Sequence, residues 1–545
     1  VTGAWCPWPP LWDFSIASLL RALGFTGIDA LAVAIWVAPL LGAIFAATLG
    51  VAIAWRLGAP AGLVAGLGVA VPMPLIFVSQ LARLDHHVAE GPLMVAIAAT
   101  VAWIAGDASG PVRPGRALVL AIVLTSALFV QTALLLGCGV AFGVLLLLAP
   151  CRARLVEGAI GFAVPTLAIG AYRLTLPADY PESAWFLGVP HALLLGGAAV
   201  ALALAATPWL WRLPRPARAI VAAGLPAVIL SAMPSIRSVV GQGGGFFGGD
   251  RWLSTIDEFR PFFDDRATIW LDALLLAPTV AAVLLFVAAR KDESRSRLAL
   301  ALFAISYGAL AITSRRLVYV SVPLIALAGT YAFDGEFRAG RKRLAGWIAA
   351  LVVLAPGIAT FVYLPSAGRS PGVQTEATIR AAIALRSLTT PGRVLAPWDR
   401  GHLVAFYSGR QVVIDNFGTM GKPGELEAAA TALLSADDEA LRRYCRDRGV
   451  TFILLNHPIA QLAATARIAG FDERRYARGT GWIEAGPDAA ATFWWRAYFA
   501  NGKAAIAGIG PPAPVRGFHL VWEDEMDVAY AFGLRGDAAQ IWAVD

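Results

Sequence analysis

The chain has 545 residues, of which 58% are hydrophobic and 15% charged, whereas soluble domains are about 45–50% apolar and about 25% charged. This composition excludes a soluble enzyme, a disordered scaffold and a disulfide-rich secreted domain, and it indicates an integral membrane protein. The net charge of +7 does not indicate a nucleic-acid partner, because Lys and Arg gather in the cytoplasmic loops of membrane proteins.

The chain begins with Val1, and no charged segment precedes an apolar run in the manner of a signal peptide. We therefore expect the start to be internal, with a further segment upstream. The four cysteines show no CxxC spacing, so the sequence predicts neither a metal–thiolate site nor a disulfide framework.

Residues 11–24 carry an apolar stripe at helical spacing, which predicts a helix that lies in the membrane interface. About twelve apolar stretches follow that are candidates for membrane spans. They lie near 28–55, 60–80, 92–106, 116–134, 135–150, 155–172, 190–211, 218–236, 268–289, 297–313, 316–333 and 344–363. The longest loop between them is 237–267, which includes the Gly-rich stretch 241–249.

The loops between these spans alternate in charge. One set contains basic clusters such as those at 290–297 and 338–343, and the other contains mostly single arginines. This bias assigns the first set to the cytoplasm. Residue 1 and everything after residue 363 are then predicted to lie outside, on the periplasmic or extracellular side of the cell membrane.

The residues after 363 differ in character from the spans. Short apolar runs (RVLAPW, QVVIDN, VTFILL) alternate with helical stretches, which predicts a compact α/β domain. The sequence therefore predicts a polytopic α-helical membrane protein followed by an external α/β domain. The boundaries are 1–27 for the end of a first external loop with its interfacial helix, 28–363 for the membrane domain and 364–545 for the external domain.

Polar clusters stand out in so apolar a chain, and the first is at 85–90. Asp85 and His87 are two residues apart, so they can point the same way from an extended loop and share one cation. Oxygen and imidazole ligands suit Mn²⁺ or Mg²⁺. The alternative is a loop tip with solvated side chains, and any complete site needs further ligands from elsewhere.

Three more polar features are predicted on the same side. Thr255-Ile256-Asp257-Glu258 offers a carboxylate on a long loop that can close over a substrate, or alternatively a helix N-cap. Trp398 and Asp399 can form a small pocket with an apolar wall and an acceptor, or a strand-to-helix turn. Arg316 opens a span where a guanidinium suits a phosphate, or where it simply snorkels.

Together, in this order, these motifs resemble the catalytic subunit of oligosaccharyltransferase in its single-subunit bacterial and archaeal form. The resemblance covers nearly the whole chain. It rests on WPPLWD (8–13), LDHHVAE (84–90), TIDE (255–258), RLVYVSVPLIALAG (316–329) and APWDRGHLVAFYSGRQVVIDNFG (396–418), the last around the family's WWDYG motif.

The resemblance implies a GT-C membrane domain of thirteen helices, so the first helix would lie upstream of Val1. It implies transfer of a glycan from a polyprenyl diphosphate to a protein asparagine, with a divalent cation, Mn²⁺ or Mg²⁺, and with no second subunit. Asp85 and Glu258 would be catalytic. Asp85, His87 and Glu258 would hold the metal, Arg316 the donor diphosphate, and Trp398, Asp399 and Glu258 the acceptor.

Two departures from the family leave alternatives open. No residue matches the essential Asp of the first external loop, which suggests a truncated, inactive relative that only binds carrier lipid. Pro397 and Arg400 stand where WWDYG has Trp and Tyr, which leaves room for another polyprenyl-phosphate-dependent GT-C glycosyltransferase with a non-asparagine acceptor. A transporter would predict buried charges within spans and half-chain repeats, and the sequence shows polar clusters at one face and no repeat.

Overall fold

The computed structural model describes residues 9–79, 86–244, 250–256, 278–291, 293–338, 347–348, 350–358, 372–418, 424–458, 461–478, 484–500, 511–524, 527–529, 535–537 and 539–545. The contacts divide the chain into two compact units. The helical unit contains the described residues of 9–244 and 278–358. The C-terminal unit contains those of 372–545 together with the short segment 250–256.

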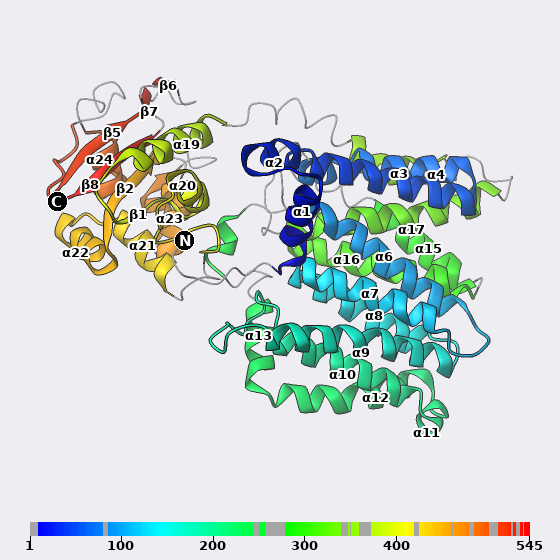
Figure 1. Cartoon of the computed structure of the whole chain (residues 1–545). Helices are drawn as coiled ribbons and strands as arrows, with labels where there is room; N and C mark the ends of the chain where they lie inside the picture. Colours follow the sequence, from blue (N-terminus) through cyan, green and yellow to red (C-terminus); the bar gives the residue numbers. More distant parts are fainter. Residues whose placement is uncertain are drawn as a thin grey trace. The chain divides into compact units, whose positions relative to one another are not determined.

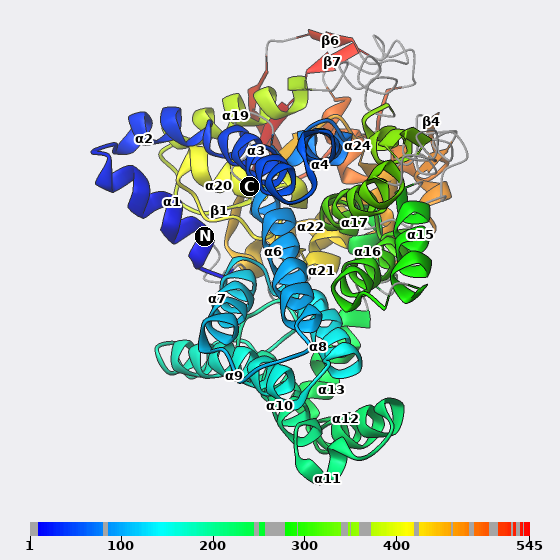
Figure 2. The same cartoon turned by 90° about the vertical axis from the view of Figure 1, so that its right-hand side faces the viewer.

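The helical unit is a bundle of neighbouring helices (Figure 1), and Figure 2 shows the same bundle from the side. Its elements are α1 (Leu11–Ala22), α2 (Gly27–Ala34), α3 (Val37–Leu57), α4 (Ala59–Ala70), α5 (Met73–Val78), α6 (His87–Gly106), α7 (Pro114–Val130), η1 (Thr132–Leu134), α8 (Leu135–Leu148), α9 (Arg152–Leu174), α10 (Val189–Ala205), α11 (Pro208–Trp211), α12 (Arg215–Ser231), α13 (Pro234–Gly244), α15 (Pro278–Lys291), α16 (Arg295–Thr313), η5 (Arg315–Leu317) and α17 (Val318–Arg338).

Five helices of the described part are long and apolar enough to cross a membrane, or six if the bent pair α12–α13 is one span. Their neighbours in the bundle also expose large apolar side chains: Leu118 and Ile122, one turn apart on α7, are 57% and 55% exposed. Such a surface suits lipid rather than water. The chain is an integral membrane protein, and the count of about twelve spans stays a prediction.

Prolines break two of the predicted spans. The span expected at 60–80 is divided into α4 and α5 at Pro72, which has an extended backbone. The span expected at 218–236 ends at Ser231. Helix α13 follows from Pro234 to Gly244, with a bend of 99° between the two helices. The start of the long loop at residue 237 was therefore predicted wrongly, because proline ends one helix and begins the next.

The C-terminal unit is a mixed α/β domain, as predicted. Its elements are η3 (Leu253–Thr255), α19 (Gly372–Ser387), β1 (Arg393–Leu395), η6 (Trp398–Arg400), α20 (Gly401–Ser408), α21 (Glu425–Leu433), α22 (Asp438–Arg448), β2 (Val450–Asn456), α23 (Leu462–Ala469), η9 (Glu473–Arg475), β3 (Ala477–Arg478), β4 (Glu484–Ala485), η10 (Ala489–Ala491), α24 (Phe493–Tyr498), β5 (Phe518–Glu523), β6 (Asp527–Ala529), β7 (Arg535–Asp537) and β8 (Ala539–Val544).

Its main sheet has the order β1-β2-β8-β5, with β1 and β2 parallel and the other pairs antiparallel. The predicted run VTFILL forms the central strand β2, which is buried along almost its whole length. The run QVVIDN does not form a strand; only Val412 bridges to Val394 of β1. Helix α19 packs its Ala377, Ala381 and Leu385 against the sheet and so builds the core.

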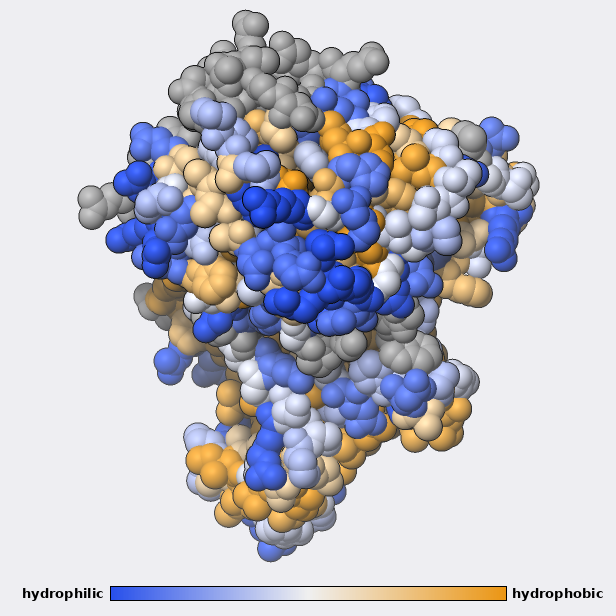
Figure 3. Space-filling model, turned by 90° about the vertical axis from the view of Figure 1, so that its left-hand side faces the viewer, coloured by the Kyte–Doolittle hydropathy of each residue, from blue (hydrophilic) through white to orange (hydrophobic). Residues whose placement is uncertain are grey.

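The surface of this unit differs from that of the helices. Figure 3 shows one face of the whole molecule, on which many residues are hydrophilic. The outer side of α22 contributes the exposed Arg443, Arg446 and Asp447. A charged surface of this kind is typical of a domain in contact with water.

Candidate active site

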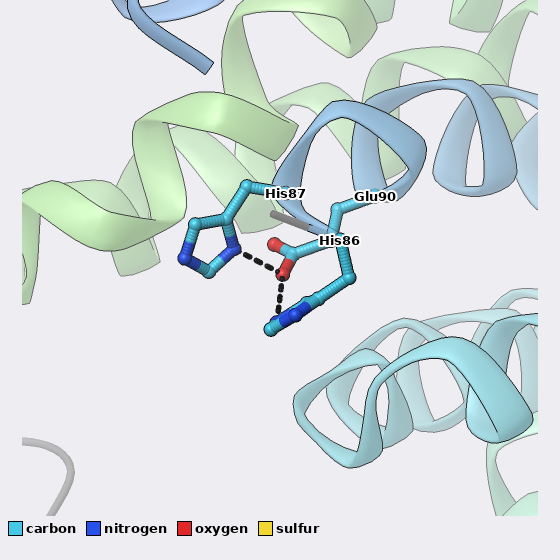
Figure 4. A group of neighbouring side chains, drawn as sticks. All are labelled: His86, His87 and Glu90. Atoms are coloured by element: carbon cyan, nitrogen blue, oxygen red, sulfur yellow. Dashed lines mark hydrogen bonds and ion pairs between the residues drawn. The ribbon is translucent and has the colours of Figure 1, made fainter. Parts of the chain in front are cut away.

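A buried polar cluster lies where α6 begins. His86 precedes the helix, His87 is its first residue and Glu90 lies in its first turn. All three side chains are buried. The Glu90 carboxylate accepts a hydrogen bond from Nδ1 of His87 (2.7 Å) and lies 3.5 Å from Nε2 of His86 (Figure 4). Ionisable groups buried in a membrane bundle are costly unless they have partners, and they mark functional sites.

Arg316 joins this cluster from η5. Its Nη1 lies 3.2 Å from Nε2 of His87, and its Nη2 lies 3.7 Å from the Glu90 carboxylate. Carboxylates only accept and guanidinium groups only donate. The His87 ring, which donates to Glu90 from Nδ1, therefore accepts from Arg316 at Nε2. The structure thus brings together His87 and Arg316, which lie 229 residues apart in the sequence.

Small residues and helix breaks position these side chains. A Cβ added at Gly91 would lie 3.2–3.3 Å from Pro323 and from the Tyr319 carbonyl oxygen, so α6 and α17 approach closely at this turn. The helical run also breaks at Gln131, between α7 and η1. This break places the Gln131 amide, whose Nε2 lies 2.6 Å from His86 Nε2.

The cluster fits a divalent cation. His86, His87 and Glu90 offer two imidazoles and a carboxylate whose candidate ligand atoms all lie within 4.8 Å of one another. This mixed donor set suits first-row transition metals such as zinc and manganese. A bound cation in this place would supply positive charge next to the Arg316 guanidinium, where an anionic group can be held between the two.

A second polar site lies in the C-terminal unit, at the turn between β1 and α20. Asp399 receives hydrogen bonds from the Gln461 amide at both carboxylate oxygens (3.2 and 3.0 Å), and Arg400 Nε lies 3.4 Å away. Burial raises the pKa of Asp399 above its ordinary value of 3.8, although the Arg400 charge opposes this shift. Trp398 beside it is half-buried. The motif forms a strand-to-helix turn and offers a carboxylate acceptor next to an indole ring.

The segment 250–256 packs against this turn. Trp252 is 2% exposed, and its ring meets that of Trp398 edge to face, with 5.8 Å between their centroids. Asp250 shapes the segment by accepting from the backbone N–H groups of Trp252 and Leu253. Arg467 of α23 donates to the Ser254 carbonyl oxygen (2.9 Å). The segment that leads into Thr255 and Ile256 is therefore anchored to the C-terminal unit.

Two of the predicted site residues, Asp85 and Glu258, lie outside the described residues. Arg316 and His87 lie together in the helical unit, and Trp398 and Asp399 lie together in the C-terminal unit. His86 and Glu90 were quoted with their motif but were not predicted as site residues. Their spacing of four residues is a usable signal, because it places both side chains on one face of a helix.

No protein-family model matches the sequence, and no curated protein matches it. Solved structures do match. The structure of the archaeal oligosaccharyltransferase AglB from Archaeoglobus fulgidus with an inhibitory peptide and a dolichol-phosphate has a TM-score of 0.76 and 15% identity, over 96% of this chain and 72% of that chain.

Two further structures of the Archaeoglobus fulgidus enzyme are similar. The one tethered to an acceptor peptide with the NVT sequon has a TM-score of 0.75 and 14% identity, over 99% of this chain and 80% of that chain. The one in complex with Zn and sulfate has a TM-score of 0.70 and 15% identity, over 100% of this chain and 81% of that chain. Over nearly its whole length, the chain therefore has the fold of the archaeal single-subunit oligosaccharyltransferases.

Proposed function

We propose that the protein is an oligosaccharyltransferase that transfers a glycan from a polyprenyl-diphosphate donor to asparagine of acceptor proteins, at the outer face of the membrane and as a single subunit. The observation that carries this proposal is the buried cluster in which Arg316 lies 3.2 Å from His87 and beside Glu90. It combines a candidate metal site with an arginine whose guanidinium suits a phosphate, in a membrane bundle, and this combination fits a lipid-linked diphosphate. The dolichol-phosphate, sequon peptide and Zn of the AglB structures support the same reading.

The chemistry requires positive charge at the donor and a carboxylate at the acceptor. A diphosphate that leaves an anomeric carbon gains negative charge, and preorganised cationic groups stabilise such charge as it forms. Arg316 supplies one of them, and a divalent cation held by His87 with Asp85 and Glu258, or with His86 and Glu90, would act as a Lewis acid there. An amide nitrogen is a poor nucleophile, and carboxylates such as Glu258 and Asp85 that accept its N–H groups weaken its conjugation and orient it.

The experiment is glycan transfer by the full-length membrane protein. Lipid-linked oligosaccharide is supplied with fluorescent peptides that contain Asn-x-Thr, Asn-x-Ala or Ser alone, with and without EDTA, followed by Mn²⁺, Mg²⁺ or Zn²⁺. Metal-dependent modification of Asn-x-Thr alone is the expected result. Consumption of donor with no peptide product would contradict the asparagine acceptor.

One observation favours a second candidate, a polyprenyl-phosphate-dependent glycosyltransferase with a different acceptor. Arg400 stands where the family motif has Tyr, and its Nε lies 3.4 Å from the Asp399 carboxylate. A cation in this place can pair with Asp399 and so compete with an acceptor hydroxyl. The Ser-only peptide and a lipid acceptor in the same assay distinguish the two candidates.

Asp399→Asn is expected to lower selection of Asn-x-Thr over Asn-x-Ala by about tenfold, since one hydrogen bond to a charged acceptor is worth about 1.5 kcal/mol or more. The same change is expected to preserve or raise the melting temperature at pH 7. Burial raises the pKa of Asp399 in the folded state, so its charged form opposes folding above that pKa. Well below the ordinary pKa of 3.8, both states are protonated and the difference should disappear. A large loss of stability at pH 7 would instead assign Asp399 a structural role.

Gly418→Ala is expected to displace the segment 250–256 and to raise the KM for acceptor peptide. A Cβ at Gly418 would lie 2.1 Å from the Trp252 ring, and φ at Gly418 is +51°. Gly409→Ala is the matched control, because Gly409 also has positive φ (+69°) but has nothing within 4 Å of an added Cβ. Hydrogen exchange of residues 250–256 and peptide KM are measured for both. Equal effects would assign the change to backbone strain alone.

A further inference from the structure

A polar cavity lies along the C-terminal half of α6, away from the His/Glu cluster in its first turn. It has a volume of about 840 Å³ and lies between α3, α6, α16 and α17. Helix α6 has 20 residues, so its two ends are about 30 Å apart at 1.5 Å per residue. The cavity is lined by α6 residues from Val95 to Gly106 and by none of His86, His87, Glu90 and Arg316, so an inference about it does not depend on glycan transfer.

Part of the cavity lining is basic. Its described lining residues include three arginines, Arg56, Arg116 and Arg297, and a single carboxylate, Asp107. The Asp107 carboxylate is already engaged, because it lies 2.5 Å from Arg116 and 3.4 Å from Arg113. Three arginines against one carboxylate give this part of the lining a net positive charge, which favours an anion.

Arg116 is the buried member of the three, with 3% of its surface exposed. Its Nη2 donates to Asp107, and its guanidinium lies 4.9 Å from the centre of the Trp103 ring. Its Nε and Nη1 make no hydrogen bond with any residue that the structure describes, although Nη1 lies 4.0 Å from Glu157. Because Arg116 is buried, it adds positive charge behind the cavity surface, while the exposed Arg56 and the half-buried Arg297 can contact a ligand directly.

Another part of the lining is apolar. It contains Leu49 and Ile53 of α3, Leu300 of α16 and Leu327 of α17, while small residues of α6, such as Ala99, leave the space between them. A cavity that joins arginines to aliphatic side chains at the end of membrane helices fits an amphiphile. Basic pockets of this kind between membrane helices bind lipid head groups.

We propose that this cavity binds the phosphate headgroup of an anionic phospholipid, with Arg56, Arg116 and Arg297 around the phosphate and the first acyl carbons against Leu49 and Leu327. A free inorganic phosphate shares the charge but not the apolar part, so the two sources can be separated. The loops at this end are the ones that the charge bias assigns to the cytoplasm.

The test measures lipid binding by the delipidated full-length protein in detergent, by native mass spectrometry and by the shift in melting temperature. The probes are dioleoyl phosphatidylglycerol, dioleoyl phosphatidylcholine and inorganic phosphate. Phosphatidylglycerol is expected to bind at least tenfold more tightly than phosphatidylcholine. Equal binding of the two lipids, or binding of inorganic phosphate as tight as that of phosphatidylglycerol, would overturn the proposal.

Variants locate the binding. Arg56→Gln combined with Arg297→Gln is expected to weaken phosphatidylglycerol binding about thirtyfold, since each basic residue near a headgroup contributes about 1 kcal/mol. Ala99→Phe keeps all three arginines but fills the cavity, and it should also remove binding. Arg212→Gln is the control, because Arg212 is an exposed arginine that does not line the cavity. Binding that is unchanged in both cavity variants would contradict the assignment.

Discussion

Glu258→Gln is expected to lower glycan transfer by about 10²–10⁴-fold, the range for loss of one group that handles a proton or orients a nucleophile. Glutamine keeps the shape of the side chain but cannot supply the negative charge that accepts both N–H groups of an acceptor amide. In the sequence, Glu258 comes two residues after the segment 250–256, which Trp252 anchors to Trp398. The rate of modification of an Asn-x-Thr peptide is measured at saturating donor.

The control for this variant is Asp257→Asn, which removes the neighbouring carboxylate of the same loop. It should change the rate only a few-fold, and both variants should keep the wild-type circular dichroism and melting temperature, because the loop is predicted to be external. Near-normal transfer by Glu258→Gln would remove Glu258 from the mechanism. Equal losses in the two variants would show that only the charge of the loop matters.

The motifs at 85–90 and 316 could be found in the sequence because charged groups are rare in so apolar a chain. Their meeting in space could be expected only through the resemblance to a known family, because His87 and Arg316 belong to helices far apart in the sequence. The role of Glu90 depends on the burial of the first turn of α6, which a polar motif at a loop tip does not reveal.

In the C-terminal unit too, local sequence patterns predicted some elements, while contacts between distant residues could not be predicted. The apolar run at 450–455 predicted β2, since a continuous run of β-branched and aliphatic residues is typical of a buried strand. The run QVVIDN has a similar pattern but makes only one bridge to β1. No local pattern showed that residues 250–256 belong to this unit. Trp252 packs closely against Gly418, which lies far away in the sequence, so this contact could not be read from the segment itself.

The anchored segment 250–256 relates the fold of the C-terminal unit to the proposed role of Glu258. Residues 250–256 belong to the compact C-terminal unit, although they precede helices of the other unit in sequence. The segment that ends two residues before Glu258 in the sequence is therefore fixed to Trp398 through Trp252. If Asp399 and Glu258 both serve the acceptor, as proposed, Gly418→Ala should affect peptide KM and the Glu258-dependent rate together.

Arg316→Ala is expected to lower transfer by about 10²–10³-fold at low donor concentration, the range for loss of one preorganised donor to a developing anion. Its main effect should be a higher KM for the lipid-linked donor, because a forked guanidinium recognises phosphate oxygens. Arg316→Lys should recover part of the loss, since it keeps the charge without the fork. Arg173→Ala is the control, because Arg173 contacts nearby backbone carbonyl groups, Glu182 and the Tyr180 ring, and none of the residues of the His/Glu cluster is among these contacts.

The same variant is expected to bind a divalent cation more tightly. In the structure Arg316 Nη1 lies 3.2 Å from Nε2 of His87, so the guanidinium occupies the lone pair that a metal needs and adds a positive charge beside it. Removal of Arg316 should therefore raise metal affinity, measured by calorimetric titration with Mn²⁺ and Zn²⁺, while transfer falls. A donor diphosphate that draws Arg316 away from His87 would have the same effect, so metal and donor should bind cooperatively in the wild type. If metal affinity fell together with transfer in Arg316→Ala, Arg316 would instead be a support for the His87 and Glu90 side chains.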